Sequence, residues 1–377
     1  MRRPSRLPVA FAMVVGLALL CAAFLASLGI DALEGRSEFQ FFADSSTYHE
    51  LARGELDHVE SAADMIGVAG NFLGPFVLLR AVGNDYYGVM VINAALLVIA
   101  VMTMARTLGM SAPHYLLLLL INPITVSSVL SVNKEILSLI CLALLLRAFA
   151  VRSIPLFLLA TALSVLVRWQ LTLVVLLMAL MLSRANLLRE RRTTSIFVLL
   201  VALSAIDVAL APVLEPSRLV FELAADEYEG SGLYQSLVSL QDLGLYILVF
   251  PIKAAHLLFG MGLRLDRLVA PQNIYNDVWQ LLHSTTSLLL FVALWRRGRL
   301  TLRNDLVYLS VIYTVIFALT PIYTPRYFFP VFVLWAAALC TPDPTSRIFT
   351  GLGQKRRRRG RPVSPQPVTP SPPVPTT

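Results

Sequence analysis

Four short polar groups interrupt a sequence that is otherwise dominated by long apolar runs. The first group, in the segment ADSSTYHELA, places Asp44, Tyr48, His49 and Glu50 close together. A carboxylate such as that of Asp44 can act as a general base towards an acceptor hydroxyl, or it can hold a metal ion. A structural alternative is that Asp44 or Ser45 caps a short amphipathic helix in which Tyr48 packs. The spacing alone leaves both interpretations open.

The second group begins where a proline breaks an apolar run. Asn122-Pro123 interrupts the run, and Lys134-Glu135 follows where the next helix is expected to begin. Free backbone N–H groups at a helix start, together with a lysine, suit a phosphate group. The alternative is a local pair between Lys134 and Glu135 that marks the end of a span.

The third and fourth groups each contain an arginine. Arg168 lies in the sequence RWQ between two short apolar runs, where it can stack on Trp169, grip a phosphate or simply extend to the interface. Arg326 and Tyr327 lie in TPRYFFP at the start of the last apolar run. A guanidinium flanked by aromatic rings fits a polyprenyl-phosphate head group with the rings along the lipid. An interfacial aromatic belt is the alternative.

The elements that must position these groups are transmembrane helices. The chain is 57% hydrophobic and only 14% charged, and its mean hydropathy is +0.71, which excludes a soluble domain of this length. Within lipid each backbone polar group must be satisfied inside its own segment, so the apolar runs are helices. We therefore predict an all-α, polytopic transmembrane protein with about ten spanning helices. The predicted spans are residues 7–30, 85–107, 112–130, 134–147, 154–167, 171–182, 196–214, 278–295, 306–319 and 327–340.

Two further apolar segments are not predicted to cross. Residues 67–82 are expected to lie in the interface or to dip back into the membrane. Residues 244–263 contain Pro251, Lys253 and His256, and counting spans from both ends leaves this segment beginning and ending on the outer side. It is therefore predicted to be re-entrant or interfacial.

The basic residues set the predicted orientation. They cluster at residues 2–6, 184–192, 296–303 and 355–361, each beside the end of an apolar run. This distribution predicts a multi-pass protein of the plasma (inner) membrane with both termini in the cytoplasm, and it argues against nucleic-acid binding.

The predicted domain organisation follows from the same pattern. Residues 1–345 form the membrane domain, and its outer loops 31–84 and 215–243 carry the site. Residues 346–377 form a basic and then proline-rich tail, which is expected to be disordered because it has no apolar face to bury.

Taken together, these features resemble the GT-C superfamily of integral membrane glycosyltransferases, which use polyprenyl-phosphate-linked sugars. The resemblance covers about residues 7–340 and is carried by ADSSTYHELA, NPITVSSVLSVNKE and TPRYFFP. It implies a GT-C-like fold, a catalytic base at or beside Asp44, and donor-phosphate binding by Lys134, Arg168 and Arg326.

The sequence also departs from the better-known members of that superfamily. It has no Asp-Asp or Asp-Glu doublet in the first outer loop and no large soluble C-terminal domain, which leaves Glu50 and Asp57 as alternative bases.

The expected function is transfer of a sugar from a polyprenyl-phosphate-linked donor to a lipid-linked or cell-envelope glycan acceptor on the outer face. The expected partners are this donor, the glycan acceptor and the lipid bilayer. The expected catalytic residues are Asp44 and Glu50, and the expected donor-binding residues are Lys134, Arg168, Arg326, Tyr327, Tyr48 and His49. The histidines show no metal-ligand spacing, so no metal site is assigned; a divalent cation held by the loop carboxylates stays open as a cofactor.

Two other functions remain as alternatives. A polysaccharide polymerase of the Wzy or EpsG type resembles this layout nearly as well. A transporter or flippase of a lipid-linked anionic solute would also explain outer basic residues, but transport needs polar residues near the middle of several helices. The predicted helix interiors are nearly uncharged, with Asp207 as the main exception.

Overall fold

The computed structural model describes residues 6–28, 48–49, 52–53, 73–183, 185–227, 232–260, 278–320 and 323–342. Every regular element in this part of the chain is a helix. The predicted tail 346–377 and most of the predicted outer loop 31–84 lie outside the described residues.

The elements are α1 (Arg6–Leu28), α5 (Leu73–Ala81), α6 (Tyr86–Leu108), α7 (Ala112–Leu120), α8 (Pro123–Leu130), α9 (Lys134–Val151), α10 (Ile154–Val167), α11 (Trp169–Leu182), α12 (Arg192–Glu227), α13 (Gly232–Leu240), the π-helical turn η1 (Gln241–Leu245), α14 (Tyr246–Phe259), α15 (Gln280–Arg296), α16 (Asp305–Phe317), the 3-10 turn η4 (Pro325–Phe328) and α17 (Phe329–Cys340).

Each predicted span corresponds to a helix or a pair of helices, but most of these helices are too short to cross a bilayer alone. In the described residues four segments are long and apolar enough to do so: Pro8–Ser27, Tyr86–Leu108, Arg192–Ala209 and Leu233–Phe259. The bent pair of α7 and α8 makes a fifth if it is counted as one span. The predicted count of about ten is therefore corrected to four or five. Helices α16 and α17 have 13 and 12 residues, so each rises only about 20 Å, against about 30 Å of hydrocarbon.

The predicted break at the Asn122-Pro123 pair is confirmed. Helices α7 and α8 meet at an angle of 91°. Pro123 has no N–H to continue the helix, and the side chain of Asn122 starts the next one by accepting a hydrogen bond from the backbone of Ile124 at 3.0 Å. The amide nitrogen of Asn122 also donates to Nδ1 of the fully buried His283 in α15, at 2.8 Å. The break is thus held by a polar contact inside the protein, as lipid-depth breaks require.

The segment that was predicted to be re-entrant does turn back on itself, although it begins earlier than residue 244. Lys253 in α14 lies 5.3 Å from the ring centroid of Tyr234 in α13, whereas a straight helix would separate these positions by about 28 Å. The bend is at Gly244, whose φ of 82° is a conformation that favours glycine. The ring of Tyr323 packs on Tyr234 at 5.2 Å, and its hydroxyl donates to the carbonyl of His256 at 3.4 Å. Although Leu233–Phe259 has the length and apolarity of a span, its two arms therefore lie against each other.

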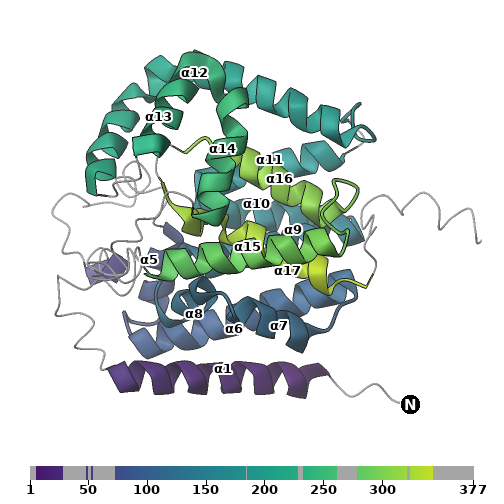
Figure 1. The fold of residues 1–377 in the computed structure, drawn as a ribbon. Coiled ribbons are helices and arrows are strands. Elements are labelled where there is room, and N and C mark those ends of the chain that lie inside the picture. Colours follow the sequence, from purple (N-terminus) through teal and green to yellow (C-terminus); the bar gives the residue numbers. More distant parts are fainter. Residues whose placement is uncertain are drawn as a thin grey trace, which may run out of the picture.

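The predicted outer loop 215–243 is largely helical. Helix α12 continues to Glu227, and α13 and the start of η1 occupy residues 232–243. The short helix α5 occupies residues 73–81 of the segment expected in the interface. Figure 1 shows α9, α10, α11, α15, α16 and α17 in the middle of the molecule, with α1 along one side, where it packs on α6.

The central helices have two distinct ends. Helix α11 runs from the junction at Arg168 to Leu182, close to the arginine-rich turn that precedes α12. Helix α16 begins at Asp305, which is paired with Arg192 at that turn, and it runs back towards Tyr327. One end of the bundle therefore carries Arg168 and Tyr327, and the opposite end carries Arg192 and Asp305.

We expect the substitution Gly74→Ala to destabilise the protein, because α5 packs directly on α10. An added Cβ would lie 2.8 Å from the carbonyl oxygen of Leu166 and 3.0 Å from a methyl group of Leu137. Such overpacking costs about 1–3 kcal/mol, which thermal unfolding of the detergent-purified protein would measure. The matched control is Gly16→Ala in α1, where nothing lies within 4 Å. There alanine should be neutral or stabilising, since it favours helix. An unchanged unfolding midpoint for Gly74→Ala would contradict this packing.

Candidate functional site

Arg168 is the centre of a buried polar cluster. It lies where α10 ends and α11 begins, in an extended conformation with φ −162° and ψ 133°. Its side chain is only 9% exposed. Its Nη2 donates to Oε1 of Glu135 at the start of α9, at 3.3 Å, and its guanidinium carbon lies 4.2 Å from the ring centroid of Tyr327 in η4. Three segments that are far apart in the sequence therefore meet at one guanidinium.

Neighbouring groups compensate the cost of burying the charge of Arg168. Burial by itself lowers the pKa of a guanidinium, but the charge of Glu135 and then the neighbouring Tyr327 and Tyr313 raise it, and the net pKa lies above the ordinary value. Stacking of Arg168 on Trp169, one of the interpretations that the sequence left open, is not what the structure shows. The Trp169 side chain is 59% exposed, and the guanidinium stacks on Tyr327.

Arg326 joins the same cluster from η4. Its side chain is buried, and its guanidinium carbon lies 5.6 Å from the centroid of the same Tyr327 ring. The turn is held in place by the hydroxyl of Tyr313 in α16, which donates to the carbonyl of Tyr327 at 2.8 Å. Two guanidinium groups, of Arg168 and Arg326, thus share one aromatic ring.

The neighbouring phenylalanines were expected along the lipid or in an interfacial belt, and they are in neither place. Phe328 and Phe329 are both buried in the core. Phe328 packs on Tyr313, and Phe329 packs on Phe332 and lies near His283. These rings hold the turn in the core; they do not face the membrane.

Lys134 lies beside Glu135 at the start of α9, and it is also buried. The side chain of Asn133 caps this helix by accepting a hydrogen bond from the backbone of Lys134 at 2.6 Å. The Lys134 ammonium lies 5.6 Å from the ring centroid of Tyr48. A continuous chain of neighbours therefore runs from Tyr48 through Lys134 and Glu135 to Arg168.

His49 attaches the segment around Tyr48 to the start of α6. Its Nδ1 donates to the side-chain oxygen of Asn84 at 2.7 Å, and its ring stacks on Tyr86 at 4.2 Å between centroids. Tyr48 itself is buried with Leu79 and Val132 in a small apolar cluster. Of the residues selected from the sequence, the structure brings together Arg168, Arg326 and Tyr327 in one group and Lys134 and Tyr48 in another. The two groups meet at the start of α9, where Lys134 precedes Glu135, the partner of Arg168.

The carboxylates selected from the sequence, Asp44 and Glu50, lie outside the described residues, as does the alternative base Asp57. The carboxylate that the structure places in the cluster is Glu135. Its second oxygen, Oε2, is buried and has no hydrogen bond to any described residue. The sequence offered Glu135 only as a local partner of Lys134, whereas the ionic partner that the structure gives it is Arg168. The available signal was an acidic residue inside an apolar run. A charge at membrane depth costs free energy, so such a residue is usually paired or functional.

A second buried polar group surrounds Lys253 in α14. Its ammonium donates to Oε1 of Gln241 at 2.5 Å. The amide nitrogen of Gln241 donates in turn to Asp207 in α12 at 3.3 Å and to the carbonyl of Leu319 at 3.1 Å. Asp207 is therefore not the main exception to uncharged helix interiors, because Lys253 is fully buried as well.

The pair of Glu135 and Arg168 should be strongly coupled in stability. Removing one partner leaves the other charge buried, which costs about 3–5 kcal/mol, whereas removing both costs much less. We therefore expect Glu135→Leu and Arg168→Met to lower the free energy of unfolding separately, and the double variant to lose clearly less than the sum. A double-mutant cycle on purified protein measures this coupling. Additive losses would mean that the two charges are stabilised independently.

Comparison with known proteins assigns no family to this chain. No protein-family model matches it, and neither a curated protein nor a solved structure matches it. What the protein does must therefore be inferred from the chemistry of its own side chains.

Proposed function

We propose that the protein is a membrane glycosyltransferase of the GT-C type. It transfers a sugar from a polyprenyl-phosphate-linked donor to a lipid-linked or cell-envelope glycan acceptor on the outer face of the plasma (inner) membrane. The observation that supports this is the convergence of two buried guanidinium groups, of Arg168 and Arg326, on the ring of Tyr327, with the buried Lys134 next in the chain to Glu135, the ionic partner of Arg168.

The chemistry of this cluster suits a phosphate. A guanidinium has five N–H donors in a planar fork that matches phosphate oxygens. The bond from Arg168 to Glu135 uses one of these donors. Stacking on Tyr327 fixes the plane of the group, so less freedom is lost when it binds a ligand. Buried arginines also interact more strongly with a phosphate than exposed ones, because the local dielectric is low.

The proposed reaction needs a base near these donors. The acceptor hydroxyl gives its proton to Asp44, and its oxygen forms a bond to the sugar's anomeric carbon. The bond between that carbon and the donor phosphate breaks, and the electron pair leaves with the polyprenyl phosphate. Arg168 and Arg326 stabilise the charge that develops there. Two observations support a carboxylate from the first loop: Tyr48 packs against Lys134, and Glu50 directly follows His49 in the sequence.

The distribution of arginines supports the proposed orientation. The end of the bundle opposite to Arg168 carries Arg189, Arg191, Arg192 and Arg303 around one cavity. Arginines beside helix ends favour the cytoplasmic side, which would put Arg168 and its neighbours on the outer side.

A polysaccharide polymerase of the Wzy or EpsG type would use the same cluster, since it also joins lipid-linked sugars. A transporter or flippase of a lipid-linked anionic solute is favoured by a different observation, the buried chain of Lys253, Gln241 and Asp207. Charged groups inside helices are typical of transport pathways. The two classes differ in whether a glycosidic bond is made.

Loss of Arg326 should abolish transfer. We expect no activity from Arg326→Ala and little from Arg326→Lys, because an ammonium cannot bind phosphate oxygens in the two-pronged way of a guanidinium. The assay is purified protein in lipid with a polyprenyl-phosphate sugar donor and a panel of acceptors. The matched control is Arg80→Ala, which removes an exposed arginine in α5 that lies over Phe76. Full activity of Arg326→Ala in the membrane would reduce this arginine to a structural role.

Loss of the base should affect turnover and spare donor binding. Asp44→Asn keeps the shape of the side chain but cannot accept a proton, so turnover should fall by roughly 10²–10⁴-fold. Binding of the polyprenyl-phosphate donor should stay near the wild-type value. If Asp44→Asn stays active while Glu50→Gln or Asp57→Asn loses activity, the base is the other carboxylate. Donor binding by a wild-type protein that forms no glycosidic bond with any acceptor would favour the transporter.

A further inference from the structure

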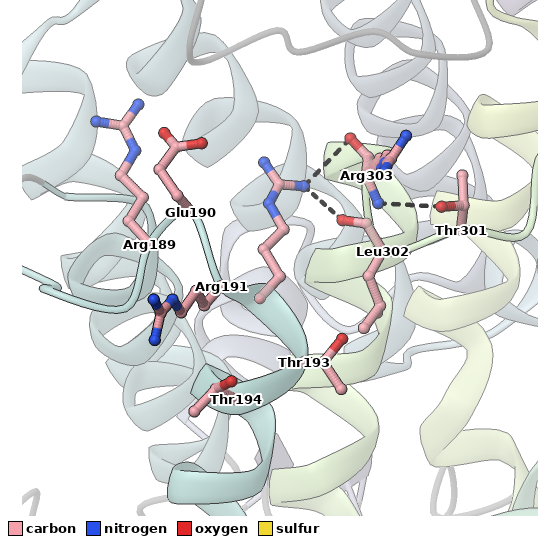
Figure 2. A pocket seen from close by; sticks show the side chains of 9 residues that line it. Arg189, Glu190, Arg191, Thr193, Thr194, Thr301, Leu302 and Arg303 are labelled. Carbon is pink, nitrogen blue, oxygen red and sulfur yellow. Dashed lines mark hydrogen bonds between the residues drawn. The ribbon is translucent and has the colours of Figure 1, made fainter.

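A cavity of about 790 Å³ lies at the end of the bundle opposite to the Arg168 cluster. Its walls are the turn that leads into α12 and the turn that leads into α16. Four arginines, Arg189, Arg191, Arg192 and Arg303, line it against a single glutamate, Glu190, together with three threonines. Figure 2 shows Arg189, Glu190 and Arg191 on one wall and Arg303 on the other. None of the residues that the sequence suggested as a site belongs to this cavity.

Arg192 forms part of the cavity wall, and its guanidinium is already bonded to protein groups. Its Nη1 donates to the carbonyl oxygens of Leu302 and Arg303, at 2.7 and 3.3 Å. Its Nη2 is paired with the fully buried carboxylate of Asp305. Its guanidinium carbon also lies 4.7 Å from the ring centroid of Tyr308. Arg192 thus fastens the two turns together and fixes the shape of the cavity.

The other three arginines are the groups that can meet a ligand. Arg191 and Arg303 are exposed, and Arg189 is half-buried. The Nε atom of Arg189 is buried and has no hydrogen bond to any described residue. Arg189 and Arg191 come from one turn and Arg303 from the other, so two walls of the cavity carry guanidinium donors, and three threonines add hydroxyl groups to its lining. This set of donors matches the oxygens of a phosphate.

The surface beside the cavity identifies the source of that phosphate. Phe197, Val198 and Val201 follow in the first turns of α12, and their side chains are exposed. Leu187, just before the arginines, is also exposed. Exposed apolar side chains that continue from an arginine cavity fit a molecule with a phosphate head and acyl chains. A lipid held at the cavity would place its acyl chains against this face of α12, whose first 18 residues are long and apolar enough to cross a membrane.

We propose that this cavity binds the phosphate head group of an anionic phospholipid, whose acyl chains lie along α12. This site is separate from the proposed transferase cluster, and it does not depend on that function. The arginines hold the head group at the membrane surface, and the lipid would fasten the turns before α12 and α16.

The test uses the full-length protein in detergent and three probes: short-chain phosphatidylglycerol, short-chain phosphatidylcholine and inorganic phosphate. Calorimetry measures binding, and the rise in unfolding temperature checks it. We expect phosphatidylglycerol to bind at least about tenfold more tightly than phosphatidylcholine, because phosphatidylcholine has the same phosphate but adds a choline cation that cancels its charge and is repelled by the arginines. The double variant Arg189→Gln/Arg191→Gln should lose this preference.

The matched control is Arg296→Gln/Arg297→Gln, which removes two exposed arginines at the end of α15, outside the cavity. It should keep the preference for phosphatidylglycerol. If the first double variant does not purify as a folded protein, Arg303→Gln replaces it, because that side chain is exposed. Equal binding of both lipids, or an undiminished preference in the cavity variants, would overturn the proposal. Inorganic phosphate that binds as tightly as phosphatidylglycerol would also overturn it, in favour of a soluble ligand.

Discussion

The position of Arg168 is the constraint on which the centre of this protein depends. A guanidinium that is buried between two apolar helices must have its charge compensated, and Glu135 and the face of Tyr327 provide that compensation. Each partner belongs to a different helix or turn. The start of α9, the junction of α10 and α11, and the turn before α17 are therefore held to one geometry by a single side chain. The neighbouring basic groups, Lys134 and Arg326, take their positions from the same arrangement.

Local features of the sequence were enough to place the helices. Apolar runs and the Asn122-Pro123 pair act within a few residues, and the helices and the break are where these features predicted them. The number of spans was overestimated because apolar runs of 12 to 14 residues were counted as spans, although helices of that length are too short to cross a bilayer alone. The 14 residues from 327 to 340 read as one span, but η4 occupies the first of them and leaves α17 with 12 residues.

Contacts between distant residues could be predicted only in part. The basic residues Lys134, Arg168 and Arg326 could be predicted as site candidates, because charges inside or beside apolar runs cost free energy and are usually functional. Their partners were not recognisable, since Glu135 and Tyr327 lie far from Arg168 in the sequence. Trp169, the nearest aromatic residue, is not the partner: Arg168 lies in an extended junction between two helices and Trp169 already begins α11, so closeness in the sequence does not bring their side chains together. The arginine cavity could not be predicted from the sequence, because its arginines also fit the ordinary excess of basic residues on the cytoplasmic side of membrane proteins.

The shortness of α16 and α17 has a consequence for the surrounding membrane. Both helices are almost entirely buried, so they are screened from lipid by longer neighbours and cause no mismatch with the bilayer thickness. Their ends must then lie below the plane of the lipid head groups. Under the proposed function, a donor phosphate would have to sink by about 5 Å from that plane to reach Arg326, if the shortfall is shared between the two faces. The voltage across the membrane would also fall over this thinner central layer, so a donor phosphate bound at Arg326 would lie inside the electric field.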